Sequence, residues 1–179
     1  QVGTENKQAM CNLTQHLIEH GHKNIAYLAG KDHLSTSAER LAGFHEAFAI
    51  KGLSHNRELM FHGKSDTEVA RLVTEQILAT HPRPTAILSS NNLMTIGVMQ
   101  TLRAHNINVP EQMALAGFDD FDWADLFEPR LSLIAQPIEQ IGVTAVRLLL
   151  KRIKNADIPY QTIQIAPEIK IRRSCGCES

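Results

Sequence analysis

The chain has 179 residues, of which 43% are hydrophobic and 21% charged, and its formal net charge is -1. This composition is typical of a soluble globular protein, without the broad basic surface of a nucleic-acid-binding domain or the roughly 20 apolar residues of a membrane span. Three cysteines, an odd number, argue against a disulfide framework and indicate a reducing cytoplasm.

Short apolar runs alternate with stretches of helical periodicity along most of the chain. The first helix is expected at 9–20, ended by Gly21, and the first strand follows at 24–28. Further helices are expected at 36–51, 65–79 and 93–104, and further strands at 59–61, 85–88 and 113–118. This alternation predicts βαβ units, and therefore an α/β fold with an open parallel sheet flanked by helices.

The helix starts carry their own signals. Thr36 and Ser65 each begin a capping-box pattern, and Asn91 or Asn92 is expected to cap the helix at 93–104. The last part of the chain differs, because several prolines interrupt it. There we predict a strand at 131–135, a long helix from Pro137 to about 155, and short extended runs at 162–165 and 168–171.

Polar residues gather where the predicted strands end. In open parallel sheets, ligands bind outside the carboxyl ends of the strands. The residues at these ends are Asp32, Ser35, Arg40, His62, Lys64, Ser89, Ser90, Asn91, Asn92, Asp119, Asp120 and Asp122.

Arg40, Asn91 and Asp119 are therefore expected at one edge of the sheet. A guanidinium, an amide and a carboxylate offer fixed donors and acceptors that suit the vicinal hydroxyls of a sugar. An apolar wall for the sugar face could come from Phe61, Phe121 or Trp123. The alternative interpretation is structural: Asn91 caps its helix, Asp119 caps a turn, and Arg40 pairs with a surface acid such as Glu39.

Two other clusters are interpreted as structural, so no metal site is predicted. His16, His20 and His22 have a spacing that can bind zinc, but a partial positive charge at a helix end explains them better. Cys175 and Cys177 are interpreted as part of a frayed or strand-end tail. The basic residues at 151–154 and 170–173 are interpreted as solvated faces.

No enzyme signature is present. The sequence lacks a G-x-S-x-G elbow, a phosphate-binding G-x-x-x-x-G-K-[ST] loop and a G-x-G-x-x-G turn. The aspartates at 119–122 have no matching acidic group elsewhere, so we interpret them as a polar loop rather than a cation site. We therefore predict a binding protein without a cofactor, and not an enzyme.

Several runs resemble the lactose-repressor/galactose-repressor family of transcription regulators. Residues 21–30 are similar to its "GH-x-x-IA-x-L-x-G" strand, and residues 40–44 to its "R-x-x-GF" helix start. Residues 86–97, 109–120 and 129–142 resemble its "N-D-x-M-A-x-G", "VP-x-D-x-x-V-x-GFDD" and "P-x-LTT-x-x-QP" segments. The order is right, and the resemblance covers nearly the whole chain.

This resemblance implies an incomplete effector-binding domain like the periplasmic sugar-binding proteins, which have two lobes and three crossing segments. Residues of about 7–128 and 165–179 would form the C-terminal lobe. Residues of about 130–160 would belong to the N-terminal lobe. The DNA-binding helix-turn-helix is expected to be absent from this chain.

The resemblance assigns effector contacts to Arg40, Asn91 and Asp119, and more weakly to Gln136. Asn92 stands where the family usually has aspartate, and Lys64 lies near a position where an aromatic residue commonly stacks on the sugar. With Arg40, Lys64 could favour a sugar acid or sugar phosphate.

The predicted function is that of a cytoplasmic regulator in which a small-molecule effector changes operator affinity. The full-length protein would bind operator DNA as a homodimer, without a membrane partner. A periplasmic sugar-binding protein of an uptake system is the alternative. The apolar stripe of the helix near 138–153 is expected to pair with a second copy, or to cause aggregation, if the fragment exists alone.

Overall fold

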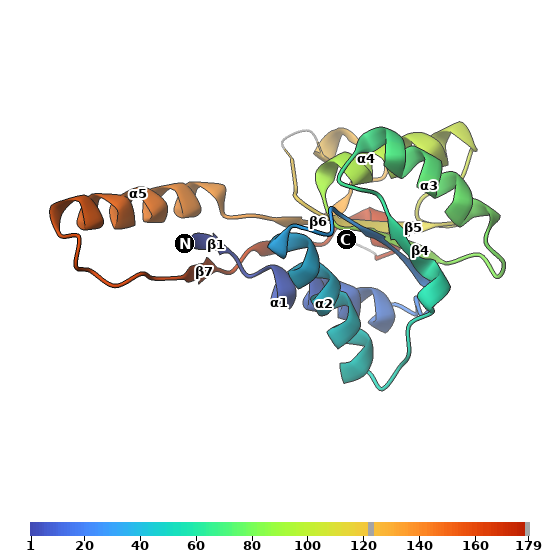
Figure 1. Cartoon of the computed structure of the whole chain (residues 1–179). Helices are drawn as coiled ribbons and strands as arrows, with labels where there is room; N and C mark the ends of the chain where they lie inside the picture. Colours follow the sequence, from blue (N-terminus) through green and yellow to red (C-terminus); the bar gives the residue numbers. More distant parts are fainter. Residues whose placement is uncertain (122–123, 178–179) are drawn as a thin grey trace.

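Two pairs of helices enclose a six-stranded sheet in the computed structural model, which describes residues 1–121 and 124–177 (Figure 1). The strand order is β3-β2-β4-β5-β6-β8, and all neighbours are parallel except β6 and β8. The strands are β2 (Ile25–Ala29), β3 (Met60–His62), β4 (Ala86–Ser89), β5 (Ala114–Phe118), β6 (Ser132–Ala135) and β8 (Glu168–Lys170). The predicted α/β class with a helix-flanked, mostly parallel sheet is confirmed.

Both faces of the sheet are covered. α1 (Asn6–Glu19) and α2 (Ser35–Ile50) lie on one face, and α3 (Thr67–Ala79) and α4 (Asn92–Ala104) lie on the other (Figure 1). Successive residues of β2 point to opposite sides, so Tyr27 joins the core under α1 and α2 while Leu28 joins the core under α3 and α4. Burial on both sides explains the continuous apolar runs in the strands.

A glycine allows each helix pair to approach closely. A Cβ built on Gly43 of α2 would lie 2.2 Å from the carbonyl oxygen of Lys7 in α1. A Cβ on Gly97 of α4 would lie 2.4 Å from the carbonyl oxygen of Thr67 in α3. In both places backbone occupies the space that a side chain would need.

The helix starts are only partly as predicted. Asn91 does cap α4, because its side chain accepts a hydrogen bond from the backbone N–H of Met94. For α3, Asp66 is the cap rather than Ser65. α2 begins at Ser35 after Leu34, with no side-chain cap, so Thr36 is not its cap.

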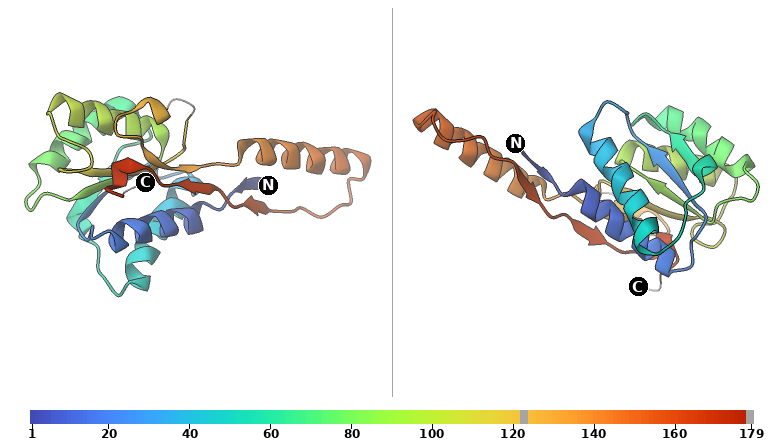
Figure 2. Two further views of the ribbon diagram at one scale, coloured as in Figure 1. Left: turned by 180° about the vertical axis from the view of Figure 1, so that it is seen from behind. Right: turned by 60° about the horizontal axis from the view of Figure 1, so that its bottom comes forward.

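A slender extension leaves the main body (Figures 1 and 2). It contains α5 (Ile138–Lys154) and a two-stranded parallel ribbon of β1 (Val2–Thr4) and β7 (Ile163–Ile165). The segment of the N-terminal lobe was predicted to begin at about residue 130, whereas β6 still pairs with β5 in the main sheet. The chain leaves the sheet only after Ala135.

Short 3-10 helices complete the described structure: η1 (Arg57–Leu59), η2 (Ala124–Leu126) and η3 (Arg173–Cys175). The predicted tail is therefore not frayed, because Ser174 and Cys175 are buried. Among the described residues, no helix is both long and apolar enough to cross a membrane.

Candidate functional site at the carboxyl ends of the strands

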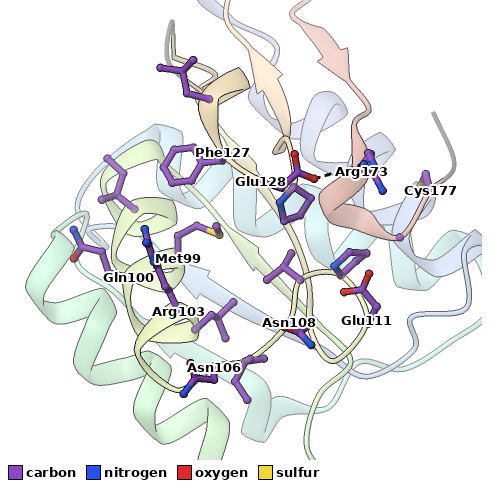
Figure 3. Close-up of a pocket in the computed structure, with 18 residues that line it drawn as sticks. Met99, Gln100, Arg103, Asn106, Asn108, Glu111, Phe127, Glu128, Arg173 and Cys177 are labelled. Atoms are coloured by element: carbon purple, nitrogen blue, oxygen red, sulfur yellow. Dashed lines mark ion pairs between the residues drawn. The ribbon is translucent and has the colours of Figure 1, made fainter.

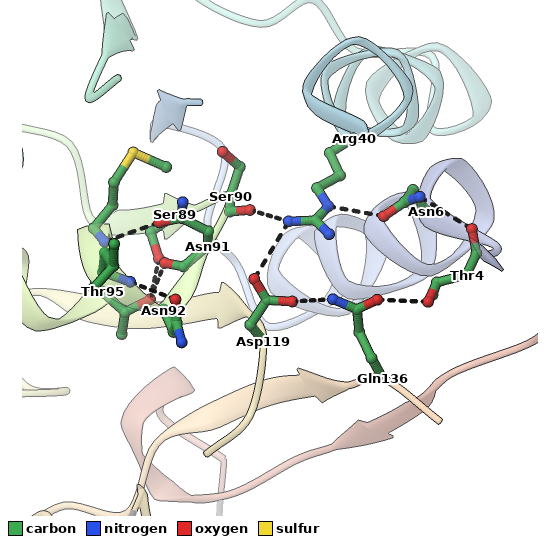
Figure 4. A network of polar contacts seen from close by, with 12 residues as sticks. Thr4, Asn6, Arg40, Ser89, Ser90, Asn91, Asn92, Thr95, Asp119 and Gln136 are labelled. Carbon is green, nitrogen blue, oxygen red and sulfur yellow. Dashed lines mark hydrogen bonds and ion pairs between the residues drawn. The ribbon is translucent and has the colours of Figure 1, made fainter. Parts of the chain in front are cut away.

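Charged and amide side chains meet just beyond β5 and β6 (Figure 4). Asp119 follows β5 directly and has a left-handed backbone conformation, with a φ of 73°. Gln136 follows β6, and its side-chain amide donates a hydrogen bond to Oδ1 of Asp119. Arg40 reaches the same carboxylate from α2, with Nη1 lying 3.6 Å from Oδ2. The strand-end rule therefore placed Arg40 and Asp119 together, whereas Gln136 was assigned by the resemblance.

Arg40 is held from several sides, although it is a cation with only 7% of its surface exposed. Its Nε donates to Oδ1 of Asn6 at 2.9 Å, and Nη1 donates to the carbonyl of Ser90 at 2.6 Å. The guanidinium carbon lies 3.6 Å from the centre of the Phe118 ring, in a cation–π contact. Among the described residues, none accepts a hydrogen bond from Nη2.

Burial has the largest effect on the Arg40 guanidinium, and it lowers the pKa. The negative charge of Asp119 acts in the opposite direction and is the second influence. Since arginine remains protonated in proteins, the result is a fixed positive charge beside the Asp119 side chain. The pair offers donors and an acceptor to one small polar molecule.

The site is tied to the segments that lead to the extension. Oγ1 of Thr4, at the end of β1, donates to Oε1 of Gln136 at 2.6 Å. Asn6 donates from Nδ2 to the carbonyl of Thr4 at 3.0 Å and to Oε2 of Glu39 at 2.9 Å. Two of the segments that lead to the extension, one after β1 and one after β6, thus contact the Arg40–Asp119 pair through the amide side chains of Asn6 and Gln136 (Figure 4).

Thr4 and Asn6 were not predicted. The first helix was predicted to begin at residue 9, so neither residue was expected to lie on a helix or strand. No local pattern reveals their role, since Asn6 and Arg40 are 34 positions apart. The predicted alternative that Arg40 pairs with Glu39 is wrong, because Glu39 bonds to Asn6 instead.

Asn91 lies beside this group without bonding to it. Its side chain caps α4, and the carbonyl of its neighbour Ser90 is the one that binds Arg40. Asn92 accepts a hydrogen bond from the N–H of Leu93. Both asparagines are half-buried and lie beside the Arg40–Asp119 pair (Figure 4).

The other predicted contacts are less central. Lys64 is exposed after β3, at the edge of the sheet, with a φ of 53°, and it has no hydrogen bond or ion pair to the other described site residues. Phe61 and Phe121 are partly buried and pack against the core under α3 and α4. Asp122 and Trp123 lie outside the described residues. The Phe118 ring contacts the Arg40 guanidinium directly.

Asp120 has a separate structural role. Arg172 donates two hydrogen bonds to its carboxylate, at 3.1 and 3.0 Å, and Nζ of Lys170 lies 2.9 Å from Oδ2. These bonds fasten the C-terminal segment to the end of β5. The interpretation of residues 170–173 as a solvated face is therefore wrong for Arg172, whose side chain is only 13% exposed.

This carboxylate predicts an acid sensitivity. Burial alone would raise the pKa of Asp120, but Arg172 and Lys170 outweigh burial and lower it. A lowered folded-state pKa stabilises the fold at pH values above the ordinary pKa of aspartate. That contribution is lost as the pH falls through the folded-state pKa. We expect the unfolding free energy of Asp120→Asn to fall less steeply than that of the parent between about pH 5 and about pH 2, measured by urea denaturation. The exposed Asp157→Asn is the control, and identical slopes for Asp120→Asn and the parent would contradict the assignment.

A separate hollow lies elsewhere on the described surface (Figure 3). It has a volume of about 1100 Å³ and is lined by α4, the turn before β5, Phe127 and the C-terminal turn. Asn108 and Pro110 precede β5, whereas Asp119 follows it, so the hollow is at the opposite edge of the sheet. Its charged groups include an Arg173–Glu128 pair at 3.5 Å, which neutralises part of its rim.

Comparisons with known proteins agree with this fold. A sequence model of the periplasmic binding protein-like domain matches residues 14–175. The chain is 34% identical over 161 residues to "HTH-type transcriptional repressor PurR" of Photobacterium profundum, covering 90% of this chain and 48% of that protein. It therefore spans about half the length of the curated relatives that it matches.

Solved structures give the same result. A transcriptional regulator CelR–cellobiose complex superposes with a TM-score of 0.90 at 29% identity, covering 97% of this chain and 53% of that one. A sugar-binding transcriptional regulator (LacI family) from Escherichia coli, complexed with phosphate, superposes with a TM-score of 0.85 at 31% identity, covering 96% and 61%.

Proposed function

Because the chain belongs to the periplasmic binding protein-like domain family, in its lactose-repressor/galactose-repressor branch, we propose that it is the effector-sensing part of a bacterial transcriptional repressor. Its effector is a sugar or a sugar-derived molecule that binds between two lobes. The observation that carries the proposal is the Arg40–Asp119–Gln136 group, which joins the strand ends to the chain crossings.

The proposed effector contacts are Arg40, Asn91, Asp119 and Gln136. Nη2 of Arg40 would donate to a ligand oxygen, and Asp119 would accept from a hydroxyl group. Each hydroxyl of a sugar both donates and accepts, so this set suits a polyol. The Arg40 guanidinium also suits a carboxylate or a phosphate. The exposed Lys64 is proposed as a contact only for an acidic ligand that extends toward β3.

The proposed mechanism is a change in the angle between the lobes. Residues 7–135 and 166–177 are proposed to be the C-terminal lobe, and the extension with α5 to belong to the N-terminal lobe. Gln136 bonds to both Asp119 and Thr4, so a ligand that competes for Asp119 alters a contact on the crossing segments. Only a ligand with different affinities for the open and closed states can shift the equilibrium between them.

Asp119→Asn is expected to weaken effector binding by about 2 kcal/mol, because a charge-assisted hydrogen bond is lost in the site. Asparagine preserves the side-chain shape and tolerates the left-handed backbone at this position. The measurement is titration calorimetry of the intact protein with a panel of neutral sugars, cellobiose, sugar acids and sugar phosphates. Operator binding by the same samples is the second readout.

The exposed Asp157→Asn is the control for this series. If Asp119→Asn binds every active compound as tightly as the parent does, Asp119 is not an effector contact. If no compound of the panel binds the intact protein or changes its operator affinity, the proposal that the protein senses a sugar is wrong.

A periplasmic sugar-binding protein is the second candidate, since it uses the same two-lobed fold. The curated relatives and the neighbouring structures named above are transcription regulators, which favours regulation. We also propose that the chain has no catalytic activity and acts in the cytoplasm. Turnover of any panel sugar or sugar phosphate by the purified protein would contradict the first of these.

The operator-bound protein is proposed to be a homodimer, with DNA contacted outside this chain. α5 contacts β1 and has no fully buried residue, while Val146, Leu149 and Ile153 are each more than half exposed. We expect the 179-residue chain to self-associate through this face, and Leu149→Glu to increase the monomer fraction. Light scattering across a concentration series measures the self-association of the parent and the monomer fraction of Leu149→Glu. Leu72→Glu on α3 is the control. A concentration-independent monomer would contradict the expectation.

A further inference from the structure

The C-terminal turn meets the last turns of α1, at a place far from the proposed effector site. His16 and His20 are one helical turn apart on the same face of α1, with ring centroids separated by 4.2 Å. Gly176 has a φ of 82° and directs Cys177 back toward that face. Sγ of Cys177 lies 3.0 Å from Nε2 of His16, across 161 positions of sequence.

Four nitrogen and sulfur donors result from this arrangement. The ligand atoms of His16, His20 and Cys177 all lie within 4.8 Å of one another. Sγ of Cys175 is 3.5 Å from Nε2 of His16 and 2.7 Å from Sγ of Cys177. Ligands of one tetrahedral zinc ion, at bond lengths of about 2.0–2.3 Å, lie roughly 3.3–3.8 Å apart. The distances from Nε2 of His16 to the two cysteine sulfurs are near this range, and the two sulfurs need to separate by about 1 Å.

The surroundings orient these donors. Nδ1 of His20 is 2.8 Å from the carbonyl oxygen of His16, so Nδ1 carries the proton and Nε2 keeps its lone pair. Metal-bound histidines commonly donate their other ring N–H to a backbone carbonyl in this way. Ser174 anchors the cysteine turn, since its Oγ donates to the carbonyl of Leu115 at 2.6 Å and accepts from the N–H of Ser132 at 2.8 Å.

The donors are accessible from one side. Cys175 is buried, His16 and Cys177 are half-buried, and His20 is exposed, so an ion can enter past His20.

We propose that His16, His20 and Cys177, with Cys175 as the fourth ligand, bind one zinc ion that fastens the C-terminal turn to α1. Two sulfur and two imidazole donors in a closed site are the ligand set of structural zinc. The site is independent of the proposed effector-binding function, because it shares no residue with the Arg40 group. In the sequence the histidines and the cysteines are separate features, and only the folded chain brings them together.

The test is titration of the reduced, chelator-treated 179-residue chain with Co²⁺, followed by Zn²⁺. We expect one Co²⁺ per chain, thiolate-to-cobalt charge-transfer absorption, and d–d bands with the intensity of tetrahedral coordination. Zn²⁺ should bleach this spectrum and raise the melting temperature. Cys177→Ser and His20→Asn should each weaken Co²⁺ binding at least about 100-fold, since even loss of an outer-shell partner costs 10–100-fold.

Matched controls carry the same substitutions outside the cluster. Cys11→Ser removes a buried thiol, and His105→Asn removes a histidine that pairs with Glu75 on the other face of the sheet. Both are expected to bind Co²⁺ like the parent. His20 is exposed, so His20→Asn keeps the test valid if a cysteine variant fails to fold. Absence of stoichiometric binding, a weak octahedral spectrum, or equal affinity in His20→Asn and the parent would overturn the proposal.

Discussion

Replacement of Arg40 with methionine is expected to lower the free energy of unfolding by about 4 kcal/mol, because removing one member of a buried ion pair strands the other. Methionine fills most of the space of the arginine stem. Asp119 would lose its ion-pair partner, and the Oδ1 atom of Asn6 and the carbonyl of Ser90 would each lose a donor. Urea denaturation of the 179-residue chain measures the change without any knowledge of the effector.

Arg71→Met is the control for this prediction. Arg71 pairs with Glu68 on the exposed face of α3, where the two side chains are 50% and 73% exposed. Exposed pairs of this kind contribute about 0–1 kcal/mol, so Arg71→Met should be nearly neutral. Equal stabilities of Arg40→Met and Arg71→Met would show that the strand-end network does not stabilise the fold.

The second large effect is expected from Gly43→Ala. Its Cβ would lie 2.2 Å from the carbonyl oxygen of Lys7 and 3.0 Å from the backbone nitrogen of Cys11, both in α1. Backbone cannot rotate away as a side chain can, so α1 and α2 would have to separate. We expect a loss of about 3 kcal/mol, at the upper end of typical overpacking costs, measured by urea denaturation.

Gly142→Ala makes the same substitution in α5 and is the matched control. No atom lies within 4 Å of a Cβ built on Gly142. Alanine should therefore be neutral or stabilising by about 0.5–1 kcal/mol, as in an unconstrained helix interior. A loss in Gly142→Ala as large as that in Gly43→Ala would mean that helix propensity, rather than the contact between α1 and α2, explains the effect.

Much of the fold follows from local pattern. The buried strands β2, β4 and β5 and all five helices were predicted within a few residues, because apolar runs and 3.6-residue periodicity depend only on neighbours in sequence. The same patterns gave the order of elements and hence a parallel sheet. The helix caps were less accurate, since Ser65 and Asp66 offer equivalent local signals and the fold uses Asp66.

The candidate site was predictable where it depends on strand ends. Asp119 follows β5 directly, and parallel strands bring their carboxyl ends to one edge, so Arg40 and Asp119 could be placed together without coordinates. Lys64 satisfies the same rule but follows β3 at the edge of the sheet. Strand order decides which loops meet, and the sequence pattern does not contain that order.

The sequence by itself determined the class of fold, the positions of the helices and strands, and the residue types at the strand ends. Only the tertiary structure decided the bonds of Arg40 to Asn6 and of Gln136 to Thr4, and the meeting of His16 with Cys177. The physical reason is the separation along the sequence over which each interaction acts. Hydrophobic periodicity acts within a few residues, whereas these contacts join residues 34, 132 and 161 positions apart, and such pairs form only after the whole chain has packed.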